Sequence, residues 1–388
     1  MLWWTYLSLG LAYWLYNLAA VIHVLRTVPR LAAITPRDDG AWPRVSHIVP
    51  ACNEAERLWA AVGSRLEEGY PNAEFVLIND RSTDDTGALM DRLAATDARV
   101  RVLHVDHLPA GWLGKVHALH RGLQLATGEW LLFSDADVHL GPGTLTRAIS
   151  HCEQHALDHI GLLPDIWRGT RMLDVVMAMF LRTFSLLVRP HAVANPRSRA
   201  AIGVGAFNLV RRSALARTPG FEGLCLDVVD DVALGQMLKR HGARSGVVNG
   251  HGYVGVRWYE SVRDMARGAE KAALASFARF SVVRLGVICL VLLALELSPF
   301  VVLLLAGKPI LQAIAAGGTV CAFLAQLIPS VSFGRPWWPA LFTPVATIVS
   351  VAILLRAGWL TVWRGGVLWR GMLYPTQMLR RGARLRFP

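Results

Sequence analysis

The chain has 388 residues, a formal net charge of +12 and a hydrophobic fraction of 53%, with only 18% charged residues. This length accommodates one large or two ordinary domains, and the apolar content excludes an ordinary soluble protein. The positive charge lies largely in arginines beside apolar stretches and forms no basic stripe interleaved with aromatics. It therefore favours a membrane surface as partner and no nucleic acid. The five cysteines are scattered without CxxC spacing, which argues against a disulfide framework or zinc site and is typical of a reducing compartment.

An uncharged apolar stretch opens the chain, from Leu2 to Leu25. Its length spans a hydrocarbon core of about 30 Å, and its tryptophans and tyrosines favour the membrane interface. No basic leader precedes it, so we interpret residues 1–26 as a transmembrane anchor and not as a signal peptide. By the positive-inside rule, the basic residues that follow the anchor place the next domain in the cytoplasm. These residues are Arg26, Arg30, Arg37 and Arg44.

Residues 44–258 alternate between strand and helix patterns and predict a soluble α/β domain. The sequence VSHIVPACNEAERL (45–58) is expected to form a strand, a loop and a helix with Asn53 as its N-cap. EFVLINDRSTDDT (74–86) repeats this order, and a strand at 98–105 and a helix at 115–126 follow. This alternation implies a parallel sheet with right-handed crossovers.

GEWLLFSDADV (128–138) is typical of a short buried strand, Trp130 to Phe133, that ends in Asp135 and Asp137. Because open α/β sheets bind ligands at the carboxyl ends of their strands, we expect these acids to face a crevice. An Asp-x-Asp pair offers the hard oxygen ligands that suit Mg²⁺ or Mn²⁺ held between a protein and a pyrophosphate. Two solvated acids in a turn are the alternative, and the other motifs of the chain decide between them.

Three more long apolar stretches follow, Leu285–Gly307, Pro309–Gly334 and Pro336–Leu355, and predict transmembrane helices within residues 285–358. Glu296 lies in mid-span and is expected to face the bundle interior or a polar cavity. Residues 259–284 carry five basic residues among alanines and phenylalanines, which predicts an amphipathic helix on the inner leaflet.

The basic C-terminal tail, residues 359–388, should also stay inside, because it contains several arginines. These include Arg380, Arg381, Arg384 and Arg386. Three spans that start inside would nevertheless leave the tail outside. One apolar stretch is therefore expected to be re-entrant or split; the alternative is that the charge rule fails here.

Five stretches in this order resemble family 2 glycosyltransferases of the GT-A fold. The likeness is to membrane-bound members that act on lipids, of the ceramide-glucosyltransferase-like, carotenoid- and hopanoid-associated kinds. IVPACNEAERL, INDRSTDDT and SDADV match two nucleotide-binding loops and the metal-binding motif. VVDDVALGQMLKRHG (228–242) matches the family's Glu-Asp helix motif, and VRWY (256–259) its Arg-Trp motif. The glutamine that precedes Arg-Trp in processive synthases is replaced by Val254, which favours transfer of a single sugar over polymer synthesis.

The resemblance implies a site for a nucleotide-sugar donor. Asp80, at the end of its strand, would contact the base or ribose, and Lys115 lies at a loop-to-helix start, where a cation and free amides meet phosphate. A solvated helix cap is the alternative for Lys115. Arg257 and Trp258 would clamp the diphosphate. The residues expected to bind the donor are Pro50, Asn53, Glu54, Asp80, Lys115, Asp135, Arg257 and Trp258.

Asp135 and Asp137 would hold the divalent cation, Mg²⁺ or Mn²⁺, with His251 as a third ligand or, alternatively, as a structural histidine. Inversion at the anomeric carbon needs a carboxylate that takes the proton of the acceptor hydroxyl. Asp231 fills this role by its place in the motif, and Asp230, which replaces the family's glutamate, would orient Asp231 or the acceptor. The alternative for this pair is two acids that complement a helix dipole.

Two further segments bear on the acceptor. GVGAFN (203–208) lacks the third glycine of a dinucleotide fingerprint, and its small residues are expected to let an acceptor-side loop approach the sugar. The apolar segment 172–188 is either an interfacial helix that leads a lipid to the site or part of the core.

The sequence thus predicts a multi-pass enzyme of the inner (plasma) membrane with a cytoplasmic catalytic domain. It would transfer one sugar from a UDP-linked donor to a lipid hydroxyl, with inversion and with a divalent cation. A processive polysaccharide synthase and a non-catalytic membrane scaffold that retains the fold are the alternatives.

Overall fold

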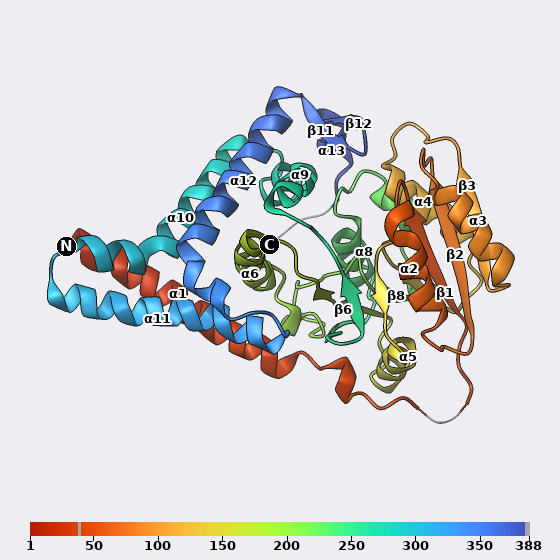
Figure 1. The fold of residues 1–388 in the computed structure, drawn as a ribbon, viewed down its shortest axis with the longest axis horizontal. Coiled ribbons are helices and arrows are strands. Elements are labelled where there is room, and N and C mark those ends of the chain that lie inside the picture. The colour runs from red at the N-terminus through yellow and green to blue at the C-terminus, as the bar shows by residue number, and fades with distance from the viewer. Residues whose placement is uncertain (38–39, 385–388) are drawn as a thin grey trace.

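The computed structural model describes residues 1–37 and 40–384, which form an α/β domain and a group of long apolar helices. The α/β domain lies on the right of Figure 1, and the apolar helices project from it to the left. Helices α6 (Arg171–Val188) and α9 (Val262–Ala272) pack against the apolar helices and so join the two parts.

A seven-stranded sheet in the order β3-β2-β1-β4-β8-β6-β9 forms the centre of the α/β domain. Four strands at one end are parallel: β1 (Val45–Ala51), β2 (Ala73–Asp80), β3 (Val100–Val105) and β4 (Trp130–Phe133). They confirm the predicted strands. The other three are β6 (His159–Leu163), β8 (Asn208–Arg211) and β9 (Ser245–Asn249).

β8 runs antiparallel to both β4 and β6, so the sheet, which was predicted to be parallel, is mixed at this strand. The chain leaves β6 at the carboxyl edge and returns to that same edge, through α6 and the loop 203–208, before it enters β8. A return to the same edge produces an antiparallel neighbour, whereas a parallel one needs a crossover to the opposite edge. The carboxyl end of β4 therefore lies beside the start of β8.

Helices cover both faces of the sheet because side chains alternate between its faces. Leu131 and Phe133 of β4 pack towards α4 and α8, while Trp130 and Leu132 pack in the cluster that includes α5. α2 and α3 cover the same face as α5, against β1 and β2. The helices are α2 (Ala55–Leu66), α3 (Thr86–Thr96), α4 (Gly114–Leu125), α5 (Thr144–Gln154), α7 (Arg212–Leu215) and α8 (Asp230–Arg240). A small second sheet contains β5 (His139–Leu140), β7 (Asp165–Ile166) and β10 (Val254–Val256).

The predicted N-cap of α2 is wrong. The cap position is Glu54, and Asn53 lies before it in the left-handed region, with φ 57°. The Asn53 Oδ1 atom accepts a hydrogen bond from the Thr83 amide at 2.7 Å, and the Asn53 amide donates to Ser82 Oγ at 3.1 Å. Asn53 thus joins the β1–α2 loop to the β2–α3 loop instead of capping the helix.

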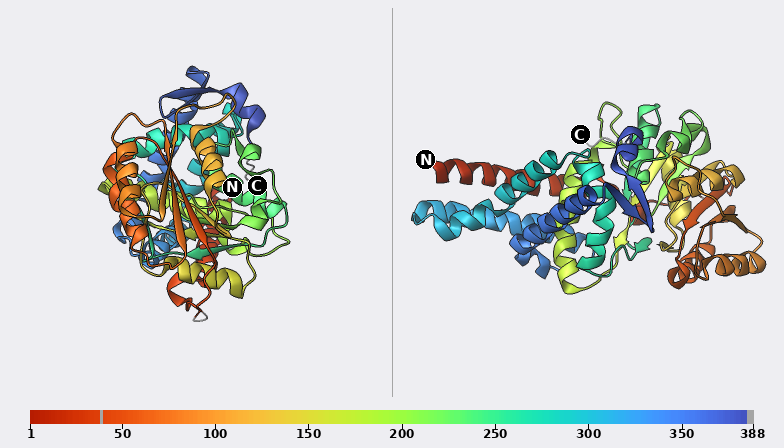
Figure 2. Two further views of the ribbon diagram at one scale, coloured as in Figure 1. Left: turned by 90° about the vertical axis from the view of Figure 1, so that its right-hand side faces the viewer. Right: turned by 90° about the horizontal axis from the view of Figure 1, so that it is seen from above.

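Among the described residues, four helices are long and apolar enough to cross a membrane. They are α1 (Leu2–Thr27), α10 (Val282–Leu305), α11 (Pro309–Ser332) and α12 (Thr343–Trp363, preceded by the 3-10 turn Trp338–Phe342). In Figures 1 and 2, α1, α10 and α11 extend together away from the α/β domain. The N-terminus and the α10–α11 turn lie at the far end.

α12 differs from the other three because it contacts α6 near its start and α9 near its end. Ala346, near its start, packs against Val175 and Met179 of α6. At the other end, Arg356 and Arg364 both pair with Glu270 of α9 at 2.7 Å. α12 therefore lies between the α/β domain and the projecting helices (Figure 1).

A buried polar cluster holds α6 among the apolar helices. The Arg182 guanidinium of α6 donates to both carboxylate oxygens of Glu296 on α10 at 2.7 Å, and to Gln326 on α11 at 2.8 Å. It also bonds Asn17 and lies 4.7 Å above the Trp14 ring, both on α1. The expectation that Glu296 faces the bundle interior is confirmed, and segment 172–188 proves to be a helix packed inside this junction.

The segments that flank the apolar helices have more structure than the sequence indicated. Residues 259–284, expected to be one amphipathic helix, contain α9, a π-helical turn at Ala273–Phe277 and the start of α10. The tail forms a hairpin, β11 (Gly366–Trp369) and β12 (Met372–Pro375), followed by α13 (Thr376–Gly382). Val367, Tyr374 and Leu379 are buried in the core around α4 and α8. Arg386 lies outside the described residues.

We predict that Arg182→Met will destabilise the protein by about 3–5 kcal/mol, because it leaves the buried Glu296 carboxylate without its cation. The double variant Arg182→Met/Glu296→Met should regain part of this loss, since it buries no unpaired charge. Thermal unfolding of the detergent-purified protein measures both. Lys308→Met, which removes an exposed charge at the α10–α11 turn, is the control and should leave the transition unchanged. Equal losses in the single and double variants would contradict the prediction.

Candidate active site

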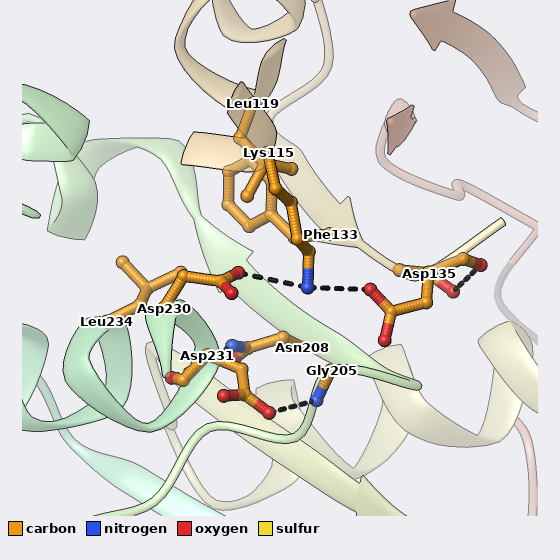
Figure 3. Close-up of a pocket in the computed structure, with 10 residues that line it drawn as sticks. Lys115, Leu119, Phe133, Asp135, Gly205, Asn208, Asp230, Asp231 and Leu234 are labelled. Carbon is orange, nitrogen blue, oxygen red and sulfur yellow. Dashed lines mark hydrogen bonds and ion pairs between the residues drawn. The ribbon is translucent and has the colours of Figure 1, made fainter. Parts of the chain in front are cut away.

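A pocket lies at the carboxyl end of β4, where the sheet changes from parallel to antiparallel (Figure 3). Four elements contribute to it: the end of β4, the start of α4, the loop 203–208 and the start of α8. Its lining residues are Lys115, Leu119, Phe133, Ser134, Asp135, Gly205, Asn208, Asp230, Asp231 and Leu234. The structure thus brings together Asp135, Lys115 and the Asp230-Asp231 pair, which the sequence had singled out in separate motifs.

Lys115 lies between acids from two motifs. Its Nζ atom is 2.7 Å from Asp135 Oδ1 and 3.1 Å from Asp230 Oδ2. Burial by itself lowers the pKa of Lys115, but the charges of Asp135, Asp230 and Asp231 outweigh burial and raise that pKa. Burial raises and Lys115 lowers the pKa of Asp135, with a net lowering. Lys115 is therefore a half-buried, paired cation and not the solvated helix cap that was its alternative.

Asp231 is held by backbone amides on both of its carboxylate oxygens. Oδ2 accepts a hydrogen bond from the Gly205 amide at 2.7 Å, and Oδ1 accepts one from the Val232 amide at 2.8 Å. Burial, followed by repulsion from Asp230, raises the pKa of Asp231 to about 6. A carboxylate with a pKa in this range is ionised at neutral pH and is also a better proton acceptor than an ordinary aspartate.

The loop 203–208 holds the two acidic motifs together. The Gly205 carbonyl accepts from the Asp135 amide at 2.9 Å, while the Gly205 amide donates to Asp231. A Cβ atom at Gly205 would lie 2.9 Å from Asp135 Oδ2 and 3.1 Å from Asp231 Oδ2. The glycine is needed because the backbone passes between two carboxylates, a role that the expected acceptor-side loop did not include.

The Asp-x-Asp motif offers oxygen ligands for a cation. Burial, followed by the charge of Asp135, raises the pKa of Asp137, so a cation placed between the two would relieve their repulsion. Arg57 Nη1 lies 3.8 Å from Asp137 Oδ2. Arg65, which is buried, donates to the Val138 carbonyl at 2.9 Å and also to the Asp135 carbonyl, and thereby fixes the backbone of the motif. The carboxylate oxygens of Asp135 and Asp137 are ligands of the kind that Mg²⁺ or Mn²⁺ prefers.

His251 lies elsewhere in this conformation. It pairs with Asp165 of β7 and packs edge-on against Phe333 at the end of α11. Within residues 1–37 and 40–384, no three His, Cys, Asp or Glu side chains are grouped so that they could hold a metal ion. A cation at Asp135 and Asp137 would therefore need further ligands from the diphosphate and water.

The residues predicted to bind the nucleotide lie at the carboxyl ends of β1 and β2. Pro50 is buried in β1, opposite Ile78 of β2. Asp80 is buried at the end of β2 and pairs with the Arg81 guanidinium at 2.8 Å. Glu54 Oε1 accepts from Arg370 of the C-terminal hairpin at 3.1 Å. These side chains line one edge of the sheet, next to the pocket.

Arg257 and Trp258 follow β10 and are exposed. Trp258 stacks on Tyr259 and meets Phe180 of α6 edge-on, with ring centroids 5.6 Å apart in both pairs. The role of Arg257 and Trp258 as a diphosphate clamp stays a prediction.

Two cations near the acids were missed in the sequence, Lys271 of α9 and Arg370 of the hairpin. They belong to segments whose basic residues had been explained by the membrane surface.

Comparison with known proteins identifies the domain that carries this pocket. Residues 46–218 match the family described as "Glycosyl transferase family 2". The chain carries a family 2 glycosyltransferase domain. The glycosyltransferase GlyG of Streptococcus pneumoniae serotype 4 is 34% identical over 93 residues, which are 24% of this chain and 30% of that protein. The 4,4'-diaponeurosporenoate glycosyltransferase of Staphylococcus haemolyticus is 24% identical over 221 residues, 56% of this chain and 57% of that protein.

The glycosyltransferase domain also has the expected GT-A fold. The mannosyltransferase PcManGT of Pyrobaculum calidifontis, solved with GDP-Man and Mn²⁺, superposes with a TM-score of 0.55 and 20% identity. That match covers 92% of this chain and 96% of the mannosyltransferase. In sequence, this chain matches only 30% of the length of GlyG and 57% of the length of the 4,4'-diaponeurosporenoate glycosyltransferase. The predicted fold class is confirmed, and its sheet is mixed.

We predict that Gly205→Ala will reduce turnover of the family 2 domain by about 100-fold, because displacement of a catalytic group by about 1 Å has an effect of this size. The added methyl group must push Asp135 or Asp231 away from its present position. Gly63→Ala in α2 is the matched control, since a Cβ there meets nothing within 4 Å. Turnover and the unfolding temperature are measured for both variants. Normal turnover of a folded Gly205→Ala protein would show that the spacing of the acids is not critical.

Proposed function

We propose that this protein transfers a single sugar from a nucleotide-sugar donor, UDP-linked, to the hydroxyl group of a membrane lipid, with inversion. One observation carries the proposal: Lys115 and the carboxylates of Asp135, Asp230 and Asp231 share one pocket at the carboxyl edge of a GT-A sheet. A nucleoside diphosphate leaving group, a cation and a catalytic base are required at one place, and this pocket supplies residues for all three.

In this proposal Asp231 acts as the base. Its carboxylate is ionised above its pKa of about 6, and it takes the proton of the acceptor hydroxyl as the oxygen attacks the anomeric carbon. The Gly205 and Val232 amides hold the carboxylate in a single orientation. The proton moves from the acceptor oxygen to Asp231, the bond from the anomeric carbon to the diphosphate breaks, and the electron pair leaves with the diphosphate.

The donor is bound by groups on the other side of the pocket. Lys115 contacts the diphosphate at the start of α4, where free helix amides add their partial positive charge. Asp135 and Asp137 hold a Mg²⁺ or Mn²⁺ ion, which when bound supplies positive charge beside the leaving diphosphate. Asp230 keeps Lys115 in place through their ion pair.

The lipid acceptor is supported by the position of the site beside apolar helices. α6 and α9 belong to the catalytic part and pack directly against α12 and the bundle. A hydroxyl carried by a membrane lipid reaches such a site from the membrane, whereas a soluble acceptor needs no such junction. One relative named above is a 4,4'-diaponeurosporenoate glycosyltransferase. Val254, in place of the glutamine of processive synthases, favours one transfer over chain extension.

We also propose a membrane topology in which α1, α10 and α11 cross the inner membrane and α12 stays on the cytoplasmic side. The tail packs on the α/β domain, so the two share one side, and three crossings with an outside N-terminus meet this requirement. The end of α1, the start of α10 and the end of α11 carry Arg26, Arg284 and Arg335, whereas the α10–α11 turn carries only Lys308. This distribution agrees with the positive-inside rule.

We predict that Asp231→Asn will reduce transfer by about 10²–10⁴-fold, because the amide cannot accept the proton. The assay uses the full chain in lipid nanodiscs, a labelled UDP-sugar and a bacterial lipid extract, with product lipids identified by mass spectrometry. Binding of UDP should stay close to that of the unmodified protein. If the pair only complements the helix dipole, transfer should survive, since asparagine caps helices about as well as aspartate.

The pH profile of the same assay tests the assignment of the base. Below pH 6 Asp231 becomes protonated and kcat/KM should fall, whereas above pH 6 it should reach a plateau, because the folded pKa is about 6. The residual activity of Asp231→Asn should lack this inflection. EDTA should abolish transfer by the unmodified protein. A chain that transfers no sugar from UDP-, GDP- or other nucleotide donors to any lipid contradicts the proposed function.

For the topology, we predict that a fluorescent protein fused after residue 388 will fluoresce and that alkaline phosphatase fused there will be inactive. The same phosphatase inserted at the α10–α11 turn, after Gly307, should be active, since that turn lies outside. The insertion serves as the control for folding of the reporter. An active phosphatase at the C-terminus would mean that α12 crosses the membrane, against its contacts with α6 and α9.

A further inference from the structure

The C-terminal hairpin is a fixed part of the catalytic domain and not a loose membrane tail. β11 and β12 pair from Gly366–Pro375 to Trp369–Met372 and leave Arg370 and Gly371 as a two-residue turn. Both turn residues have positive φ, 48° and 78°, as a tight hairpin turn of this length requires. The strands are anchored by Val367 and Tyr374, which are buried beside α4. The turn residues are therefore held in place.

The hairpin reaches the loops that are proposed to bind the donor. Arg370 Nη1 donates to the Cys52 carbonyl and Nη2 to Glu54 Oε1, both at 3.1 Å, in the β1–α2 loop. Met372 Sδ lies 3.3 Å from Arg81 Nη1, in the β2–α3 loop. The third contact is the packing of the buried Tyr374 side chain in the same cluster as Leu113 and Val116, the neighbours of Lys115 at the start of α4. Residues 366–375 thus cover the carboxyl ends of β1 and β2.

A second cation approaches the acids from α9. The Lys271 ammonium lies 5.1 Å above the ring of Trp369, at the end of β11. Burial lowers the pKa of Lys271, the charge of Lys115 lowers it further, and the charges of Asp230, Asp135 and Asp231 oppose this lowering. These mutual effects mean that Lys271 and Lys115 act on the same three carboxylates. The charges of Lys271 and Arg370 also lower the pKa of Asp135.

We propose that Lys271 and Arg370 bind the diphosphate of the donor from the hairpin side of the pocket, facing Lys115, with Trp369 as the platform that positions Lys271. This inference rests on the proposed function, since it names further donor-binding residues of the same site. A diphosphate beside three carboxylates adds negative charge to a site that is already negative, and Lys115 together with a divalent cation offsets only part of it. Cations from the hairpin side supply the missing positive charge.

The Arg370–Glu54 pair allows a simpler role, in which Arg370 only fastens the hairpin. The two roles differ in what they do to ligands. A fastening role affects nucleotides with one or two phosphates alike, because the whole edge of the pocket is disturbed. If the side chain contacts the diphosphate, its removal weakens binding of UDP far more than binding of UMP, because UMP lacks the second phosphate.

The test measures binding of UDP and UMP to the full chain in nanodiscs by calorimetry, in the presence of Mg²⁺. Lys271→Ala and Arg370→Ala should each weaken the binding of UDP by about 10-fold or more, the size expected for loss of one charge-assisted hydrogen bond. The same variants should weaken the binding of UMP much less. Trp369→Ala should weaken UDP by about 2- to 30-fold, as loss of a cation–π contact allows. Arg370→Lys should retain part of the affinity. Arg380→Ala, in α13 of the same tail, is the matched control and should bind as the unmodified protein does.

The outcomes separate this inference from the proposed function. If the unmodified chain binds neither UDP nor GDP, the proposed function fails. If it binds UDP and both alanine variants bind UDP equally well, only the role of the hairpin and α9 is overturned. Equal weakening of UDP and UMP, with a lower unfolding temperature, would assign Arg370 to fastening the hairpin and would also overturn the inference.

Discussion

The constraint on which the site depends is the repulsion between carboxylates gathered at one edge of the sheet. Asp135, Asp230 and Asp231 line one pocket and come from two distant motifs. Like charges at this separation disfavour ionisation, so the site is stable only with cations among them. Lys115 is the first of these, and its pairs with Asp135 and Asp230 join α4 to β4 and α8. The same negative field favours a divalent cation and cationic groups around a bound diphosphate.

Backbone geometry complements this electrostatic arrangement. The loop 203–208 accepts a hydrogen bond from Asp135 and donates one to Asp231, so the distance between the metal-binding motif and the proposed base depends on one glycine. The reversal of direction at β8 brings that loop to the carboxyl edge. A parallel strand at this position would start from the opposite edge, and the two acids would have no common backbone contact.

The long apolar helices are coupled to the α/β domain by charges in an apolar setting. Arg182 and Glu296 are fully buried and connect α6 with α10, while Asn17 and Gln326 bring in α1 and α11. A buried pair of this kind fixes the relative position of helices because any other arrangement leaves a charge unpaired. Phe180 of α6 also contacts Trp258, which follows β10, so the position of α6 in the bundle affects the position of Trp258.

The sequence by itself determined the parallel strands β1 to β4, the helices between them, the apolar helices and the acids at strand and helix ends. These features follow from local patterns: apolar strands bounded by turns, helical periodicity and long uncharged stretches. Only the tertiary structure decided the antiparallel β8, the role of Gly205, the loop-joining role of Asn53 and the placement of α12 and the C-terminal hairpin. Each of these depends on contacts between residues far apart in the chain, such as Arg370 with Glu54 and Lys271 with Trp369. A basic residue in such a segment looks the same in the sequence whether it meets a membrane or a diphosphate, because the fold alone determines which groups surround it.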